Sequence, residues 1–214
     1  MKSPPIPSGL FIKNRKKLVD SMGKGSVGII GSNKSMPRTG DLYYPFRQHS
    51  DLFYLTGINQ EESVLVLASD HNKQPLQEVL FIKKPTTKSA LWNGPGLTFK
   101  EAIQQSGISQ VRWLDELTGF LEELIPSRAK VYSGGTLPKE NLTEQFPDTI
   151  LTPLSQLTTY LRMVKELEEL EQMKKASGIT KSAFLRVLKM MKPEIWEYEV
   201  EAEIIDEIIG NFPL

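Results

Sequence analysis

The sequence predicts an α/β fold in which helices pack on a sheet. Residues 63–68 and 79–82 are nearly continuous apolar runs, a pattern typical of strands that are covered on both faces. Up to about residue 153, short apolar runs of this kind alternate with segments whose apolar residues recur at helical spacing. This alternation indicates an α/β sheet with helices packed on it.

The first elements follow from the spacing of apolar residues. Leu10, Phe11 and Leu18 lie on one face of an expected helix that Gly23 ends. Residues 27–30 form a short apolar run between glycines and are expected to be a buried strand. The polar segment 32–40 is expected to be a loop.

The densest stretch of the chain, residues 43–57, reads YYPFRQHSDLFYLTG. Pro45 fixes its own φ and favours an extended Tyr44, so the stretch is expected to begin as a tight loop. Ser50 is then the expected N-cap of a short helix, and Gly57 its end.

The remaining elements of the predicted sheet domain have clear start and stop signals. They are a helix that opens with a capping box at Thr98 and stops near Gly107, a strand at 111–114, a helix capped by Asp115, and a last strand at 129–132.

The pattern changes after Pro153. Residues 162–192 are expected to form one long amphipathic helix, and residues 196–209 a second one. Two amphipathic helices without a sheet to cover are an incomplete domain. We therefore predict domains at residues 1–153 and 154–214, the second being the truncated, purely helical start of a larger domain.

Composition excludes several classes of protein. Lysine plus arginine and aspartate plus glutamate are balanced at 26 each, so no global charge directs the chain to nucleic acid or to an acidic membrane. No cysteine is present, which removes disulfides, thiolate zinc sites and cysteine nucleophiles. No apolar run is long enough for a signal peptide or a membrane span. The expected location is cytoplasmic.

No self-sufficient catalytic group is apparent. His49, Ser50 and Asp51 are neighbours in sequence, and such neighbours cannot line up as nucleophile, base and orienting group. The other histidine, His71, stands apart, without the convergent ligands that a metal needs. We expect no catalytic residue and no metal ligand in this chain.

Trp92 lies in a loop rich in glycine and proline. Large aromatic side chains on loops are candidates for interface anchors or pocket walls. Covering the edge of a sheet is an equally ordinary role for such a residue. The sequence leaves both interpretations open.

Several of these segments carry a family resemblance. Residues 44–57, followed by residues 62–67, resemble the N-terminal domain of Xaa-Pro aminopeptidase, also called aminopeptidase P. Residues 161–165, 168–170 and 192–203 resemble the first helices of the same family's catalytic domain, which has the "pita-bread" fold. The resemblance extends from about residue 10 to residue 209.

The resemblance implies a mixed sheet flanked by helices, as in the creatinase and aminopeptidase P N-terminal domains, followed by the start of a pita-bread domain. It also implies a parent enzyme in which two metal ions, usually manganese, activate a water that removes the residue before a penultimate proline. In the family the metal ligands lie in later strands of the catalytic domain, beyond Leu214. This chain is therefore expected to be inactive by itself.

Two substrate-binding residues are implied by the same resemblance. Trp92 matches a tryptophan that reaches the active site of a neighbouring subunit, and Asp41 matches an aspartate in a polar network near that site. A homo-oligomer, either dimer or tetramer, is implied with them. The chain would then shape the substrate cleft and the oligomer.

Two other functions are weighed against this one. The first is a non-catalytic protein-interaction module with a creatinase-like fold. The second is an independent small-ligand domain, which no phosphate- or carboxylate-binding motif supports.

Overall fold

The computed structural model describes residues 6–69, 76–85, 94–125, 130–136, 142, 144–147 and 149–211. The connection that carries His71 and the loop that carries Trp92 lie outside these residues. The described chain divides into two compact units, one formed by residues 7–164 and the other by residues 165–211 with Ile6. In the described residues, no helix is both long and apolar enough to cross a membrane.

The first unit contains a mixed sheet. Within the described residues its strand order is β6-β5-β4-β1-β7-β8. The strands are β1 (Ser26–Gly31), β4 (Ser63–Ala68), β5 (Gln77–Ile82), β6 (Gln110–Trp113), β7 (Lys130–Gly134) and β8 (Leu151–Pro153). Strand β4 is antiparallel to both of its neighbours, whereas β6, β7 and β8 are added in parallel. The predicted mixed sheet flanked by helices is confirmed.

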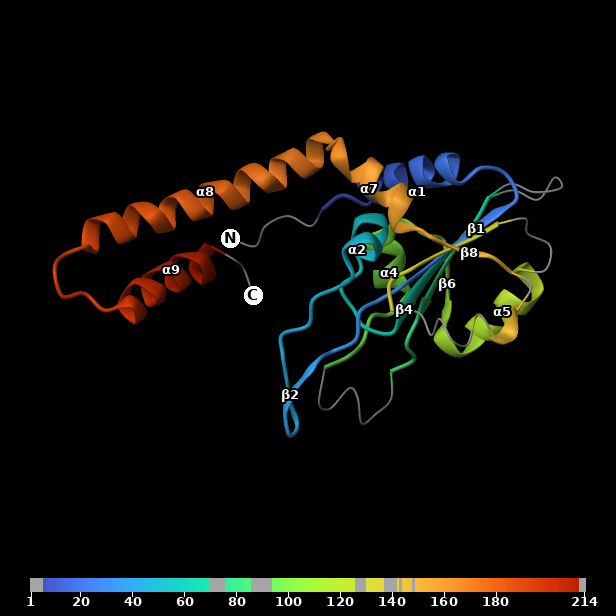
Figure 1. Cartoon of the computed structure of the whole chain (residues 1–214), viewed down its shortest axis with the longest axis horizontal. Coiled ribbons are helices and arrows are strands. Elements are labelled where there is room, and N and C mark those ends of the chain that lie inside the picture. Colours follow the sequence, from blue (N-terminus) through green and yellow to red (C-terminus); the bar gives the residue numbers. More distant parts are fainter. Residues whose placement is uncertain are drawn as a thin grey trace. The chain divides into compact units, whose positions relative to one another are not determined.

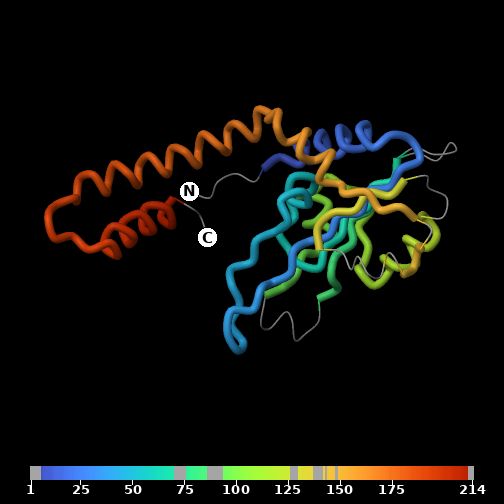
Figure 2. The backbone as a smooth tube through the Cα atoms, in the orientation of Figure 1, coloured from blue at the N-terminus to red at the C-terminus, as the bar shows by residue number. Residues whose placement is uncertain are grey.

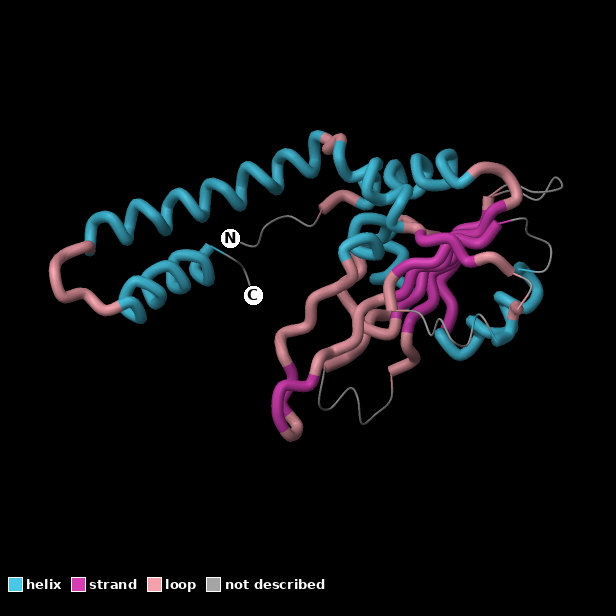
Figure 3. The backbone as a smooth tube through the Cα atoms, in the orientation of Figure 1, coloured by secondary structure: helices cyan, strands magenta, loops and turns pink. Residues whose placement is uncertain are grey.

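Helices cover both faces of this sheet (Figures 1 and 3). Helices α1 (Ser8–Met22), α2 (Ser50–Thr56), α4 (Phe99–Ser106) and α7 (Ser155–Met163) pack on one face. A 3-10 turn (Leu114–Glu116) leads into α5 (Leu117–Leu124), which packs on the other face. Alternate strand residues divide between the two cores: Leu65 and Leu67 face α2, while Val64 and Val66 face α5.

A small hairpin extends from this unit. Strands β2 (Pro37–Thr39) and β3 (Leu42–Tyr43) pair with each other and not with the main sheet. Figure 2 shows the hairpin, in the blue part of the trace, projecting beyond the end of the sheet. The sequence interpretation of residues 32–40 as a plain loop was wrong. Three-residue strands lie below the length at which apolar alternation becomes visible.

Arg15 joins three helices in the core. Its guanidinium is fully buried, and Nη1 donates to the carbonyl of Leu55 at 2.8 Å and to that of Ser106 at 2.9 Å. These carbonyls belong to the last turns of α2 and α4, where a cation also meets the favourable end of each helix dipole. Glu78 on β5 lies 3.1 Å from Nη2 as the counter-charge. One side chain of α1 thus fixes two helices and a strand.

Helix α2, within residues 43–57, ends as predicted, but its N-terminus is not capped as predicted. Gly57 is in the left-handed conformation and its N–H donates to the carbonyl of Phe53, which closes α2. The predicted cap at Ser50 was wrong, because His49 is the N-cap residue and no side chain caps the helix. Instead the Asp51 carboxylate lies in the first turn, where the helix dipole favours an anion.

Asp51 connects α2 to α7. Its Oδ2 accepts a hydrogen bond from the Thr158 hydroxyl at 2.8 Å, and its Oδ1 pairs with Arg162 at 2.9 Å. Asp51 and Thr158 are buried, while the Arg162 side chain is 44% exposed. The compact unit therefore includes α7 and extends to Val164, beyond Pro153. The boundary between evolutionary domains near Pro153 stays a prediction.

The C-terminal unit is a pair of helices, α8 (Leu167–Met190) and α9 (Glu197–Asn211). The predicted continuous helix from 162 to 192 was wrong, since the chain is extended at Val164 and Glu166 between α7 and α8. Arg186 of α8 donates to carboxylates of three α9 residues: Glu203, Asp206 and Glu207. These hydrogen bonds, that of Glu207 above all, raise the pKa of Arg186.

Two further sequence interpretations need correction. Asp115 lies inside the 3-10 turn and does not cap α5. Strand β7 is not the last strand, because β8 pairs in parallel with it. Strand β8 contains only three residues and ends at a proline, so its sequence carries no strand signal.

Replacing Arg15 with methionine should lower the free energy of unfolding of the first unit by roughly 2–4 kcal/mol, because two helix-terminal carbonyls and Glu78 lose their partner. Urea denaturation followed by circular dichroism measures the change. The same substitution at the exposed Arg47 is the control and should change stability by less than about 0.5 kcal/mol. Equal effects at both positions would contradict the role assigned to Arg15.

Gly135 should not tolerate alanine. Its φ is +72°, and a Cβ would lie 1.9 Å from the carbonyl oxygen of Gly31. Gly135→Ala should therefore cost at least about 2 kcal/mol in thermal or urea unfolding. In the matched control, Gly119→Ala, the new Cβ meets nothing within 4 Å inside helix α5 and should stabilise the protein by up to about 1 kcal/mol. A neutral Gly135→Ala would disprove the close approach of β1 and the end of β7.

Asp51→Asn should loosen α7. The substitution removes the charge that Arg162 pairs with and leaves a single acceptor for two donors, at a cost of about 1–3 kcal/mol. Amide hydrogen exchange across residues 155–163 should accelerate more than exchange in the central strands. Asp20→Asn, at an exposed position of α1, is the control. Unchanged protection of α7 in Asp51→Asn would refute the connection.

Candidate functional site

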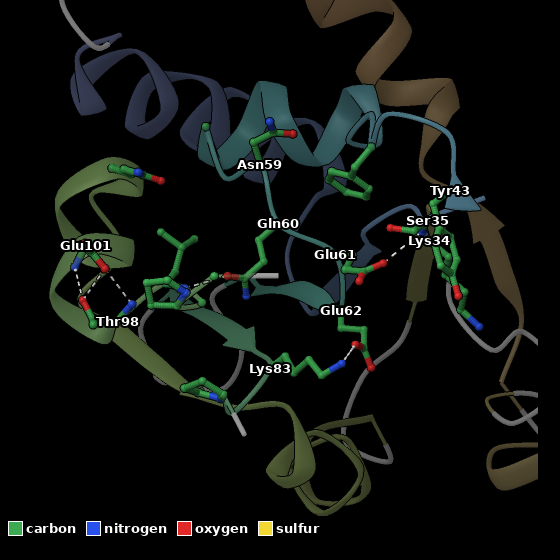
Figure 4. A pocket seen from close by; sticks show the side chains of 18 residues that line it. Lys34, Ser35, Tyr43, Asn59, Gln60, Glu61, Glu62, Lys83, Thr98 and Glu101 are labelled. Carbon is green, nitrogen blue, oxygen red and sulfur yellow. Dashed lines mark hydrogen bonds and ion pairs between the residues drawn. The ribbon is translucent and has the colours of Figure 1, made fainter. Parts of the chain in front are cut away.

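A pocket of about 1070 Å³ opens at one end of the sheet in the first unit. Its walls come from the segment after β1, the hairpin, the segment between α2 and β4, the end of β5, and the start of α4 (Figure 4). Its polar lining includes the side chains of Lys34, Gln60, Glu61, Glu62, Lys83 and Glu101. The pocket therefore lies where several loops meet on a rigid support.

Two glutamines hold the loops around the pocket together. The Gln60 side-chain oxygen accepts a hydrogen bond from the N–H of Leu97 at 2.8 Å, and the Gln60 carbonyl accepts one from Gln48 at 2.7 Å. The Gln48 side-chain oxygen in turn accepts from the N–H groups of Asn33 and His49. Gln48 is buried, so these bonds are shielded from competing water. These polar contacts fix the loops in addition to the apolar packing of Ile58 and Leu97 against the core.

Both carboxylates between α2 and β4 are anchored. Glu61 Oε2 accepts from the N–H of Ser35 at 3.0 Å, and Glu62 forms an ion pair with Lys83 across the end of the β4–β5 ladder. Figure 4 shows these two interactions on neighbouring sides of the pocket. Glu62 has a φ of +52°, which costs a non-glycine residue about 1 kcal/mol. Backbone strain of this kind is concentrated at functional sites.

The opposite wall is the N-terminus of α4. Thr98 and Glu101 form the predicted capping box, with the Thr98 hydroxyl donating to Glu101 at 2.7 Å and the N–H of Thr98 donating at 2.9 Å. The backbone hydrogen bond from Thr98 and then its hydroxyl lower the pKa of Glu101. Glu101 is thus a fixed negative charge at neutral pH. Its lowered pKa makes it stabilise the helix above its unfolded pKa and lose that effect as acid protonates it.

Of the two predicted substrate-binding residues, Asp41 lies in the part of the chain that the structure describes. Asp41 is exposed in the turn between β2 and β3 and does not line the pocket, although Tyr43 at the base of the same hairpin does. Trp92 lies outside the described residues. Residues 94–96, which follow it closely in sequence, line the pocket.

Sequence reasoning missed the polar residues of the pocket. The run Gln60-Glu61-Glu62 directly before a buried strand is the one signal that points to them. Lys83 follows the neighbouring strand in the same way. In the part of the chain that the structure describes, no group of three or more histidine, aspartate or glutamate side chains is arranged to hold a metal ion.

Comparisons with known proteins agree on one family. The family model "Aminopeptidase P, N-terminal domain" matches residues 11–132, more than half of the chain. Xaa-Pro aminopeptidase of Escherichia coli is 27% identical over 92% of this chain and 48% of its own length, and that of Haemophilus influenzae is 25% identical over 94% and 47%. The chain spans about half the length of these curated relatives.

Solved structures give the same result. A structure of a putative aminopeptidase P from Bacillus anthracis has a TM-score of 0.87 and 26% identity, covering 95% of this chain and 52% of the other. Aminopeptidase P from E. coli with the inhibitor Pro-Leu also has a TM-score of 0.87 and 26% identity, covering 97% of this chain and 50% of the other. The chain therefore belongs to the family of the aminopeptidase P N-terminal domain.

Proposed function

We propose that this chain is the N-terminal region of a metal-dependent Xaa-Pro aminopeptidase, an enzyme that removes the N-terminal residue preceding a proline. The observation that carries the proposal is the likeness to whole aminopeptidase P structures over 97% of this chain, which includes α8 and α9 as well as the sheet domain. The likeness thus continues well past the family match at residue 132.

The chain spans about half the length of its curated relatives, and we propose that the chemistry lies in the half of the parent enzyme that the chain does not match. Among the described residues, no group of three or more histidine, aspartate or glutamate side chains is arranged to hold a metal ion. Two manganese ions in that half would supply the activated water and stabilise the tetrahedral intermediate. The region described here would shape the substrate cleft and the oligomer and would have no peptidase activity alone.

Asp41 and Trp92 are proposed as substrate-binding residues that act from a neighbouring subunit of a dimer or tetramer. Support comes from the hairpin on which Asp41 lies. Its surroundings expose large apolar side chains, with Leu42 59% and Tyr43 61% exposed. A projecting hairpin with exposed aromatic and aliphatic groups is suited to contact another subunit. A cytoplasmic location stays a prediction from the sequence.

The alternative, a non-catalytic interaction module, is not favoured, because the relatives reported above carry peptidase names. It would predict a partner surface that functions without a peptidase half. A specific protein partner, bound equally well whether or not a proline peptide is present, would bring this alternative back.

An activity assay tests the proposal. With added Mn²⁺, the 214-residue chain should not cleave an X-Pro-X peptide, because the metal ligands are proposed to lie in the other half of the parent enzyme, whereas a form extended to the full length of its relatives should cleave it. Released amino acid, measured by chromatography, reports the reaction. A peptide with alanine in place of proline and a sample treated with a chelator are the controls. Cleavage by the 214-residue chain alone, or no cleavage by the extended form, would refute the proposal.

A further inference from the structure

The pocket beside β4 and β5 is lined by polar and charged side chains that have no part in the roles proposed for Asp41 and Trp92. Its walls contain charges of both signs, amide side chains and apolar surface. Glu62 is held there in a left-handed conformation that the pairing of β4 with β5 does not require, since the ladder begins at Ser63. These features together indicate a binding site.

We propose that this pocket binds a peptide chain that carries a positive and a negative group near each other. The amides of Asn59 and Gln105 line the pocket, and neither makes a hydrogen bond to another described residue. A side-chain amide offers both a donor and an acceptor, which is the pairing that a peptide backbone needs. Pro95, Leu97 and Phe46 add apolar surface for the side chains of the ligand.

Lys34 and Glu61 would bind the charged groups of the peptide. Lys34 is exposed and forms no ion pair with a described residue, so its ammonium is available to an anionic group. Glu61 is oriented by the hydrogen bond that it accepts from the N–H of Ser35, the residue after Lys34. In Figure 4, Lys34 and Ser35 lie on the same side of the pocket and Glu61 points toward them. A positive and a negative group thus come from the same side of the pocket.

Other ligand classes fit less well. Glu62 and Lys83 are paired with each other, so a phosphate or nucleotide would face the carboxylates of Glu61 and Glu101 against the ammonium of Lys34. A metal ion lacks a convergent set of three ligands among the described residues. A peptide satisfies the amides, the apolar surface and both charges.

The inference deepens the proposed function and rests on it in one respect. If the parent enzyme cleaves peptides, the ligand of this pocket is a stretch of the substrate chain outside the X-Pro bond. The pocket would then favour long peptides with charged residues over dipeptides and tripeptides, since only the former can occupy it.

The test is direct binding to the 214-residue chain. The probe is an acetylated and amidated hexapeptide with one lysine and one glutamate and no proline, so neither a charged terminus nor the X-Pro motif contributes. Titration followed by ¹H–¹⁵N correlation spectra gives the Kd and the location of the perturbed amides. Perturbations should concentrate at residues 34–35, 59–62 and 97–105. A matched peptide with glutamine at both charged positions should bind about tenfold more weakly.

Variants locate the site. The double variant Lys34→Gln/Glu61→Gln should weaken binding of the charged peptide at least about tenfold. Lys24→Gln/Glu123→Gln makes the same change of charge at exposed positions outside the pocket and should leave the Kd unchanged. Circular dichroism confirms that each variant is folded. Equal Kd values for the two double variants, perturbations elsewhere on the surface, or no binding by the unmodified chain would each overturn the inference.

The two proposals fail separately. If the extended enzyme does not cleave X-Pro peptides but the pocket still binds the hexapeptide, the peptidase assignment falls and the peptide site remains. If the extended enzyme is active and the hexapeptide does not bind, only the peptide site falls.

Discussion

The buried guanidinium of Arg15 is the contact on which the sheet domain most depends. Helices α2 and α4 both end against it, and without a donor their terminal carbonyls would be buried and unsatisfied. Asn14 adds a second bond of the same kind, from its amide to the carbonyl of Tyr54 at 2.9 Å. Two adjacent polar residues of α1 therefore position the two helices that frame the pocket, and do so with directional contacts that apolar packing does not provide.

The contacts of Arg15 and Asn14 with these helices also determine the geometry of the pocket. The chain leaves α2 at Gly57 and runs through Gln60 to Glu62, while α4 begins at Thr98 on the opposite side. Because Arg15 holds the C-terminal ends of both helices, the distance across the pocket is set in the core. The hydrogen bond from Leu97 to Gln60 then joins the two walls. A preorganised site of this kind loses little entropy when it binds a ligand.

Much of the fold could be predicted from the sequence, because most helices and strands are long enough for the spacing of their apolar residues to be recognised. The helix ending at Gly23, the strands around residues 63–82 and the capping box at Thr98 all follow from spacing and local chemistry. The predictions that were wrong concern features that depend on residues distant in sequence or on very short elements. The break before α8 was hidden by a continuous apolar stripe, and β8 has no pattern of its own. The pocket was missed for a similar reason: Gln60, Lys83 and Lys34 come together only through the fold.

The position of β1 has a consequence for synthesis of the chain. This strand lies between β4 and β7, and its parallel partner β7 leaves the ribosome about 100 residues after it. Translation adds roughly 5–20 residues per second, so β7 is synthesised on the order of 5–20 s after β1. During that time one edge of an almost wholly apolar strand has no partner. Non-local parallel pairing is intrinsically slow, so this unpaired edge is exposed to aggregation during translation. The glycines at its end, Gly31 against Gly135, then let β7 close the gap without side chains in the way.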